Sequence, residues 1–263
     1  MPKIPCPECG SFHAWLIRRG KRKCRECGRE FPGDAYPVAG FRATAADWRR
    51  CVRAFLRERA ILALASNAGL SQYMAERMAM RLRALMTADS PSGMAGPVEM
   101  DETYIGGQRK NKRLHIRRIA GKRGHGTDKL PIFGAFDRAS GTVLVAVEPR
   151  KLDIAFIAAT LLERAAPGVE LYTDGFKMYR GLASRGFRHQ WVDHDGGELA
   201  RGEVHTNNIE GFWGILKREL GCIGGMRRKY LHLFVGEIAW RFNHRRDSVA
   251  AKERALMKLV LRR

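Results

Sequence analysis

Three acidic residues placed in regular patterns constrain the fold of this chain most strongly. Asp101 lies in the segment 98–104, whose alternating apolar and polar residues predict a half-buried strand. Asp174 ends a short apolar run at residues 171–173, which predicts a second strand, and Glu210 lies in the segment 208–220, which predicts a helix. One carboxylate from each of two strands and one from a helix form a pocket suited to paired divalent cations. We therefore expect these distant segments to meet at one site.

The segments between residues 98 and 220 predict a mixed α/β domain. The predicted strands cover residues 98–104, 130–136, 143–148, 170–173 and 189–192, and the predicted helices cover residues 154–165, 176–184 and 208–220. This order of strands and helices is that of a ribonuclease-H-like sheet, in which the first and fourth strands are neighbours. Asp101 and Asp174 are therefore expected side by side near the centre of the sheet, with Glu210 brought over them by the last helix.

The expected meeting point of these acids is suited to magnesium. Carboxylate oxygens are the ligands that Mg²⁺ prefers in proteins. We expect Asp101 to bridge two Mg²⁺ or Mn²⁺ ions, Asp174 to bind one of them and Glu210 the other. Such an ion pair, roughly 3.5–4 Å apart, promotes attack on a phosphodiester. Glu102 should point to the opposite face of a regular strand and is a poorer candidate. The alternative is that the acids form ordinary salt bridges on a basic protein.

Polar residues flank Glu210 along the chain. Lys217 follows it by seven residues, which is two helical turns, so both side chains lie on one helix face, where Lys217 would reach a phosphate. His205, Asn207 and Asn208 precede Glu210. They either orient ligands or the nucleophile, or they cap the start of the helix.

Four cysteines in two C-x-x-C pairs indicate a metal site near the N-terminus. The pairs are Cys6 with Cys9 and Cys24 with Cys27, and 14 residues separate them. This spacing predicts a zinc ribbon over residues 1–36 with a structural Zn²⁺ ion. Since the segment is too short and polar to fold on apolar burial alone, the ion would supply its folding energy. The alternatives are redox dithiols or coincidence.

Residues 42–88 have a helix-turn-helix layout. Helices are predicted at residues 45–58 and 60–66 and from residue 71 to about 86, with a glycine-containing turn before the last one. Arg77 and Arg81 on that last helix are expected to face DNA. The alternative is a small helical bundle with solvated arginines.

Residues 87–97 form a predicted linker to a catalytic domain at 97–246, and a C-terminal helix is expected at 247–263.

The charge of the chain points to nucleic acid. The formal net charge is +21 and the pI about 10.4, which favours double-stranded DNA over a small metabolite as partner. The alternative is a ribosome-associated or otherwise merely basic protein.

A basic loop follows Asp101. It is either a solvated surface loop or a second DNA contact, and we favour the DNA contact, made by Arg109, Lys110, Lys112, Arg113, Arg117 and Arg118. With no leader, no membrane-crossing run and no disulfide framework, the expected location is the cytoplasm, at the bacterial nucleoid.

Four sequence blocks resemble one family. Residues 98–107, 172–175, 205–218 and 234–246 closely resemble the bacterial DDE insertion-sequence transposases of the ISXO-like, zinc-ribbon type. The resemblance implies an enzyme that binds terminal inverted repeats, cleaves DNA at the element ends and joins the 3′-hydroxyl to target DNA. It also implies that Asp101, Asp174 and Glu210, with Lys217, are the catalytic set.

Joining two ends requires at least a homodimer on DNA. Two alternatives to this function remain: a ribonuclease-H-like nuclease without strand transfer, and a non-enzymatic DNA-binding regulator derived from a transposase.

Overall fold

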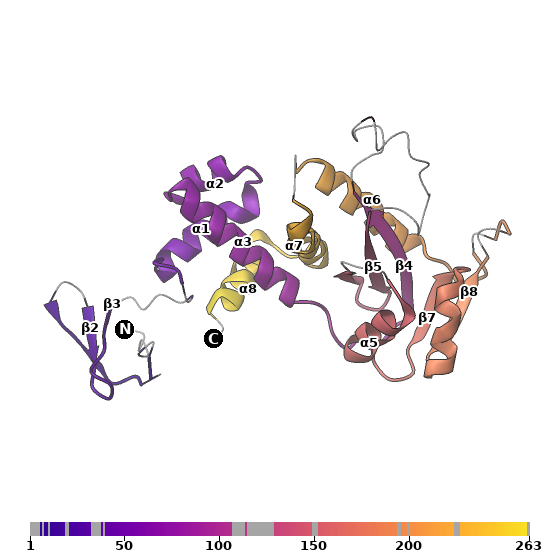
Figure 1. The fold of residues 1–263 in the computed structure, drawn as a ribbon, viewed down its shortest axis with the longest axis horizontal. Helices are drawn as coiled ribbons and strands as arrows, with labels where there is room; N and C mark the ends of the chain where they lie inside the picture. Colours follow the sequence, from indigo (N-terminus) through magenta and orange to yellow (C-terminus); the bar gives the residue numbers. More distant parts are fainter. Residues whose placement is uncertain are drawn as a thin grey trace. The chain divides into compact units, whose positions relative to one another are not determined.

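A computed structural model describes most of the 263-residue chain. The described residues are 6, 8–9, 11–18, 21–32, 38, 40–106, 114, 129–148, 152–193, 196–198, 200–223 and 227–261. They form two compact units, one of Met1–Leu85 with Asp247–Arg263 and one of Met86–Arg246 (Figure 1). No described helix is both long and apolar enough to span a bilayer.

A small antiparallel sheet begins the first unit. Its strands are β1 (Ala14–Leu16), β2 (Lys21–Cys24) and β3 (Glu30–Pro32), in the order β1-β2-β3. The buried core of this sheet consists of Cys6, Cys24 and Phe31, with Ala14 packed against it. Such a core buries too little apolar surface to fold a domain unaided, which is why the cysteine cluster matters for its stability.

Four helices form the rest of the first unit: α1 (Ala45–Arg57), α2 (Ile61–Ala68), α3 (Gln72–Ala88) and α8 (Val249–Leu261). A capping box formed by Thr44 and Asp47 starts α1. Gly69, at φ +62°, ends α2 in the left-handed conformation and turns the chain toward α3. Helix α3 includes residues 87 and 88, so the first two residues of the predicted linker are helical.

The C-terminal helix α8 lies against α1 (Figure 1). Arg53 of α1 donates to Glu253 of α8 at 2.9 Å, and α8 buries Leu256, Met257 and Val260. Helices at opposite ends of the sequence therefore share one unit.

A five-stranded mixed sheet forms the centre of the second unit. Its strands are β4 (Val98–Ile105), β5 (Leu130–Asp137), β6 (Thr142–Val147), β7 (Glu170–Asp174) and β8 (Arg188–Val192), in the order β6-β5-β4-β7-β8. Strand β5 is antiparallel to β4 and β6, whereas β7 is parallel to β4 and β8. The predicted pairing of the first and fourth strands is thus confirmed, and the fold is ribonuclease-H-like.

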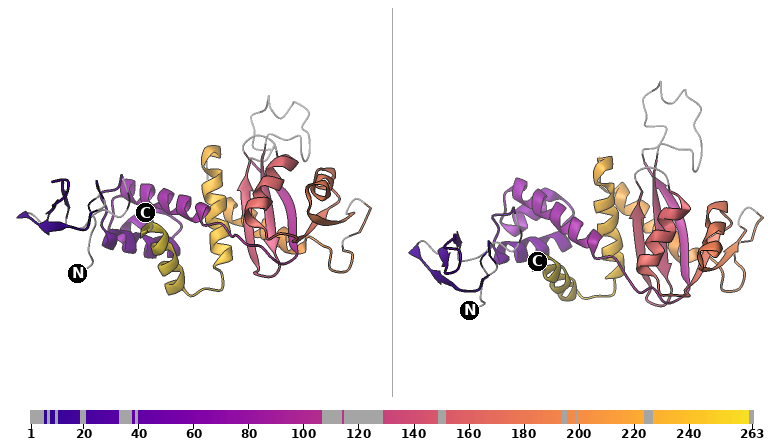
Figure 2. Two further views of the ribbon diagram at one scale, coloured as in Figure 1. Left: turned by 90° about the horizontal axis from the view of Figure 1, so that it is seen from below. Right: turned by 60° about the horizontal axis from the view of Figure 1, so that its bottom comes forward.

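Helices cover both faces of this sheet (Figure 2). On one face, α5 (Ile154–Arg164) and the 3-10 helix η4 (Lys177–Arg185) share a buried core with Met100 and Phe133. On the other face, α6 (Asn207–Gly221) and α7 (Leu231–Asn243), which follows the short η5 (Arg228–Tyr230), bury Ile132 and Phe136. The sequence predicted only a short helix where η4 lies; its nine residues wind as a 3-10 helix and end at Gly186, at φ +85°.

One close contact joins α6 to the sheet. The indole ring of Trp213 lies against Gly134 of β5, where a Cβ, if one were added, would lie 2.5 Å from the ring. Only glycine leaves room for this ring, and in the register of the sheet Gly134 stands opposite Asp101.

We predict that Gly134→Ala destabilises the protein by about 1–3 kcal/mol, because the added methyl group forces the Trp213 ring away from the sheet. Urea unfolding followed by circular dichroism measures the change. The matched control is Gly214→Ala on α6, where a Cβ meets nothing within 4 Å; it should stabilise by about 0.5–1 kcal/mol. Equal stability of the two variants would contradict the prediction.

Candidate functional site

Asp101 and Asp174 lie on neighbouring parallel strands. The register pairs Val98 with Leu171 and Glu99 with Tyr172. Continued two residues further along both strands, it brings Asp101 level with Asp174. The sheet therefore places these two carboxylates next to each other, as the sequence predicted.

The two faces of β4 carry different side chains. Asp101 points toward α6, where its Oδ2 accepts a hydrogen bond of 2.9 Å from Trp213 Nε1. Glu102 points toward η4 and accepts a hydrogen bond of 2.5 Å from Tyr179, which is buried in the core on that face. The alternation of the strand thus separates Glu102 from Asp101, as expected for a regular strand.

The electrostatics of Asp101 show that acidic groups gather around it. Burial, together with the charges of Asp174 and Glu210, raises the pKa of Asp101 to about 6, although hydrogen bonds from the Glu102 backbone and Trp213 lower it. Burial, together with the charges of Asp101 and Asp174, raises the pKa of Glu102 to about 8, although the hydrogen bond from Tyr179 lowers it. Carboxylates that are buried and repel one another favour the binding of a cation.

Glu210 lies in the first turn of α6, where it is exposed. Thr206, the buried residue before the helix, donates a hydrogen bond of 2.7 Å from its hydroxyl to Glu210 Oε1. This bond restricts the orientation of the carboxylate. Lys217 is exposed on the same helix.

Asp101, Asp174 and Glu210 do not form a compact cluster like that of the four cysteines. Within the described part of the chain, only the cysteine quartet brings the ligand atoms of three or more Cys, His, Asp or Glu residues within 4.8 Å of one another. Ligands that are divided between two ions roughly 3.5–4 Å apart need not approach so closely. The carboxylates of Asp101, Asp174 and Glu210 are hard oxygen donors, the kind of ligand that Mg²⁺ prefers.

The cysteine quartet has the dimensions of a zinc site. The sulfur atoms of Cys6 and Cys27 lie 3.5 Å apart, as do those of Cys9 and Cys24. Four sulfurs about 2.3 Å from a tetrahedral ion lie about 3.8 Å from one another, and a disulfide is far shorter. Burial raises the pKa of Cys6, but hydrogen bonds from the Cys9 and Glu8 backbone and from the Cys27 and Cys24 side chains together lower it to about 7. Desolvation and neighbouring thiols raise the pKa of Cys9 and Cys27, although backbone hydrogen bonds lower it. Cys6 therefore forms the thiolate that zinc binds more readily than Cys9 and Cys27 do.

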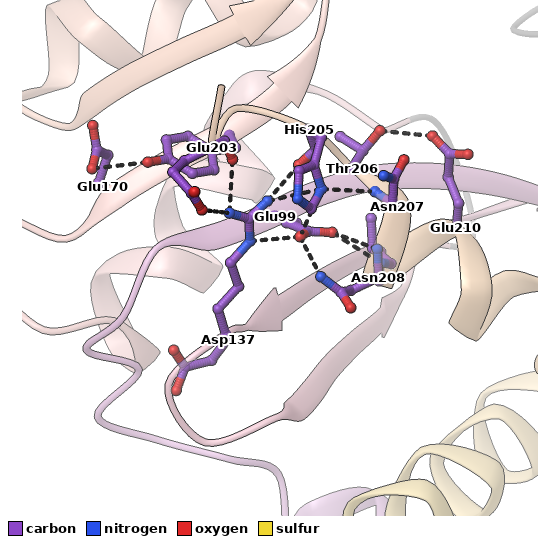
Figure 3. Close-up of polar contacts among 12 residues, drawn as sticks. Glu99, Asp137, Glu170, Glu203, His205, Thr206, Asn207, Asn208 and Glu210 are labelled. Atoms are coloured by element: carbon purple, nitrogen blue, oxygen red, sulfur yellow. Dashed lines mark hydrogen bonds and ion pairs between the residues drawn. The ribbon is translucent and has the colours of Figure 1, made fainter. Parts of the chain in front are cut away.

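Sequence reasoning missed a buried ion pair beside the acids (Figure 3). Glu99 is fully buried and accepts a bond of 2.6 Å from Arg138 Nε. Glu99 also accepts bonds from Asn208, and His205 lies next to Arg138. His205 Nδ1 accepts a bond of 3.4 Å from the backbone N–H of Asn207, as a helix cap would, whereas the side chain of Asn208 donates to Glu99.

A signal for Glu99 was present in the sequence. Glu99 stands two residues before Asp101 and so shares its face of the strand. Arg138 had no such signal, because it is one of 48 Lys and Arg residues.

The predicted DNA contacts differ in their surroundings. Arg81 is exposed on α3. Arg77 donates to the carbonyl of Gly40 at 3.0 Å, and its guanidinium lies over the rings of Phe41 and Tyr73, at 4.7 and 5.6 Å from their centroids. The loop residues predicted to contact DNA lie outside the described residues; they are Arg109, Lys110, Lys112, Arg113, Arg117 and Arg118.

A ribonuclease-H-like sheet with acids on its central strands and on the helix that crosses them defines a polynucleotidyl transferase. The model of the ISXO2-like transposase domain family matches residues 93–243, more than half of the chain. The chain therefore belongs to the ISXO2-like transposases, and it is an enzyme of the DDE transposase type.

Proteins from two organisms are similar to this chain. An uncharacterized protein in transposable element ISH50 of Halobacterium salinarum is 29% identical over 243 residues, which cover 87% of this chain and 81% of the relative. An uncharacterized transposase-like protein of Haemophilus influenzae is 33% identical over 91 residues, 33% of this chain and 73% of the relative. Among solved structures, the HTLV-2 integrase catalytic core domain in complex with magnesium aligns over 57% of this chain and 85% of that chain, with 16% identity and a TM-score of 0.32.

We predict that the purified protein carries one zinc ion per chain and that Cys24→Ser loses it, because a neutral hydroxyl is a poor zinc ligand. Mass spectrometry of the metal content measures this. Cys222→Ser, at a free and exposed cysteine of the second unit, is the matched control and should retain zinc. Full zinc occupancy in the Cys24 variant would contradict the assignment.

We predict that Mn²⁺ stabilises the wild-type protein and that Asp101→Asn abolishes most of this effect. An ion that binds only the folded state adds about 2.7 kcal/mol at 100 times its Kd. Melting temperatures with and without Mn²⁺ measure the gain, and Glu163→Gln on the exposed side of α5 is the control. A gain of equal size in the Asp101 variant would show that the ion binds elsewhere.

Proposed function

We propose that this chain binds the terminal inverted repeats of an insertion sequence, cleaves DNA at the element ends and joins the freed 3′-hydroxyl to target DNA. The observation that carries the proposal is the half-buried Asp101 carboxylate on β4, level with Asp174, whose pKa is raised by burial and by the charges of Asp174 and Glu210. Such a cluster is costly for a fold that does not bind cations, and it suits one that does.

In this proposal the three acids bind the metal ions. Asp101, Asp174 and Glu210 would together hold two Mg²⁺ or Mn²⁺ ions, with Asp101 shared between them, Asp174 serving one and Glu210 the other. When bound, these ions lower the barrier to displacement at phosphorus. Lys217 lies two helical turns beyond Glu210 and binds a phosphate of the DNA end as a point charge.

Two displacements of the same kind complete the reaction. Water first attacks the phosphodiester at the element end, forming a P–O bond and releasing the 3′-hydroxyl as the leaving group, which takes up a proton. That hydroxyl then attacks a phosphodiester of the target, loses its proton and releases a target 3′-hydroxyl. No external energy source is needed, because the first step is a hydrolysis and the second exchanges one phosphodiester bond for another.

The first unit supplies the DNA recognition in this proposal. Helices α2 and α3 with the Gly69 turn between them have the helix-turn-helix form, and the exposed Arg81 is available to the DNA. Arg77 is assigned to the same surface. The zinc ribbon, with Cys6, Cys9, Cys24 and Cys27 as ligands, and the basic loop add further contacts to double-stranded DNA at the nucleoid. Two element ends require a homodimer or a larger assembly.

We predict that Asp174→Asn keeps its affinity for DNA that carries the element ends but lowers end cleavage by about 100-fold or more, because phosphate contacts supply the binding and the carboxylate serves the chemistry. Gel-shift titration and a cleavage assay with labelled ends measure the two effects. Asp247→Asn, at an exposed position, is the control and should cleave normally.

The same substrates separate this function from its rivals. Ends supplied already cut, with free 3′-hydroxyls, should be joined to target DNA by the wild-type protein. A nuclease would cleave uncut ends but never join pre-cut ones. A DNA-binding regulator would bind the ends without cleaving them, and its biological effect would survive Asp174→Asn.

A further inference from the structure

A carboxylate from another element caps the helix that carries Glu210. The first backbone N–H groups of a helix have no acceptor within it, and Thr206 at the N-cap position gives them none from its side chain. The backbone N–H groups of Asn208 and Ile209 donate instead to Glu99 Oε2, at 2.8 and 3.2 Å, and Asn208 Nδ2 donates to Glu99 Oε1 at 2.7 Å (Figure 3). Glu99 therefore fixes where α6 starts relative to β4, the strand that bears Asp101.

Arg138 balances the charge of this buried cap. Its Nε donates to Glu99 Oε1 at 2.6 Å, and the side chains of Arg138 and Glu99 are 15% and 0% exposed. Removing two charges from water costs so much that a buried ion pair adds little net stability relative to an apolar pair of the same size. The position that the ion pair gives to α6 therefore explains the pair better than a gain in stability does.

The Arg138 guanidinium contacts both strands that carry acids and the segment that leads into α6. It bonds to Glu99 on β4, and it donates from Nη1 and Nη2 to the carbonyl oxygens of Glu203 and His205, at 2.7 and 3.2 Å, in the segment that leads into α6. It also lies over the ring of Tyr172, 4.9 Å from the centroid, two residues before Asp174 on β7. The Arg138 side chain thus connects β4, β7 and the segment before α6. The relative positions of these three parts determine where the acids lie.

We propose that Glu99 and Arg138 are positioning residues, which hold the N-terminus of α6 so that Glu210 faces the pair formed by Asp101 and Asp174. Thr206 completes the connection, since its hydroxyl bonds to Glu210 from the segment that Arg138 holds. This inference rests on the proposed function, because it assigns the pair to the alignment of the metal ligands.

The test uses Arg138→Lys in the full-length protein. Lysine keeps the positive charge but lacks the planar fork that bonds to Glu99, Glu203 and His205 together. We expect the Mn²⁺ affinity measured by calorimetry to fall about 10-fold, and the Mn²⁺ concentration for half-maximal end cleavage to rise by a similar factor. Affinity for end DNA should stay unchanged.

Two further variants complete the test. Asn208→Ala removes one side-chain donor to Glu99 while leaving the ion pair intact, and it should give a smaller shift of the same kind. It decides the question if Arg138→Lys does not fold. Arg201→Lys is the matched control, because Arg201 forms an exposed ion pair with Glu198 in the same unit, and it should change neither measurement.

The outcomes separate positioning from plain stabilisation. A lower melting temperature with unchanged Mn²⁺ affinity and unchanged metal dependence of cleavage would overturn the proposal. If the wild-type protein binds Mn²⁺ but cleaves no ends, the proposed function fails, and calorimetry on Arg138→Lys and Asn208→Ala still decides the positioning role. A wild-type protein that binds no Mn²⁺ would overturn both.

Discussion

The parallel pairing of β4 with β7 is the constraint on which the catalytic unit depends. Parallel neighbours need a long crossover between them, and here β5, β6 and α5 intervene in the sequence before the chain returns to the centre of the sheet. Because both strands run in the same direction and Glu99 pairs with Tyr172, Asp101 in the middle of β4 lies level with Asp174 at the end of β7. Asp101 and Asp174 are neighbours for this reason, and no local interaction between them is needed to bring them together.

Strand β4 carries three acidic side chains that are fully or half buried. Glu99, Asp101 and Glu102 follow one another within four residues of β4, and each has a polar partner: Arg138, Trp213 and Tyr179 respectively. Glu99 and Asp101 point toward α6, whereas Glu102 points toward η4. Repulsion is thereby divided between two faces: Asp101 feels the charges of Asp174 and Glu210, and Glu102 those of Asp101 and Asp174. An apolar strand would be easier to bury but would have nothing to bind.

The sequence predicted the strands and their order, which follow from periodicity along the chain. It did not predict contacts such as that of Glu99 with α6, which depend on packing between distant segments. Strong alternation and apolar runs located all five strands of the mixed sheet, and their order with the helices was enough to predict that the first and fourth strands pair. The 3-10 winding of η4 was missed because the pattern of a short helix does not specify its hydrogen bonding. Glu99 could be placed on the Asp101 face by counting, but its role as a cap needed the position of α6. Nothing local distinguished Arg138 from other arginines.

The contact between α1 and α8 has a consequence for how the protein is made. The ribosome delivers α1, α2 and α3 first, then the whole catalytic unit, and α8 only after residue 248. The helical unit that starts near the N-terminus thus acquires its final packing surface last, after the mixed sheet has left the exit tunnel. A nascent chain can therefore fold its catalytic sheet before α8 packs against α1 and completes the first unit.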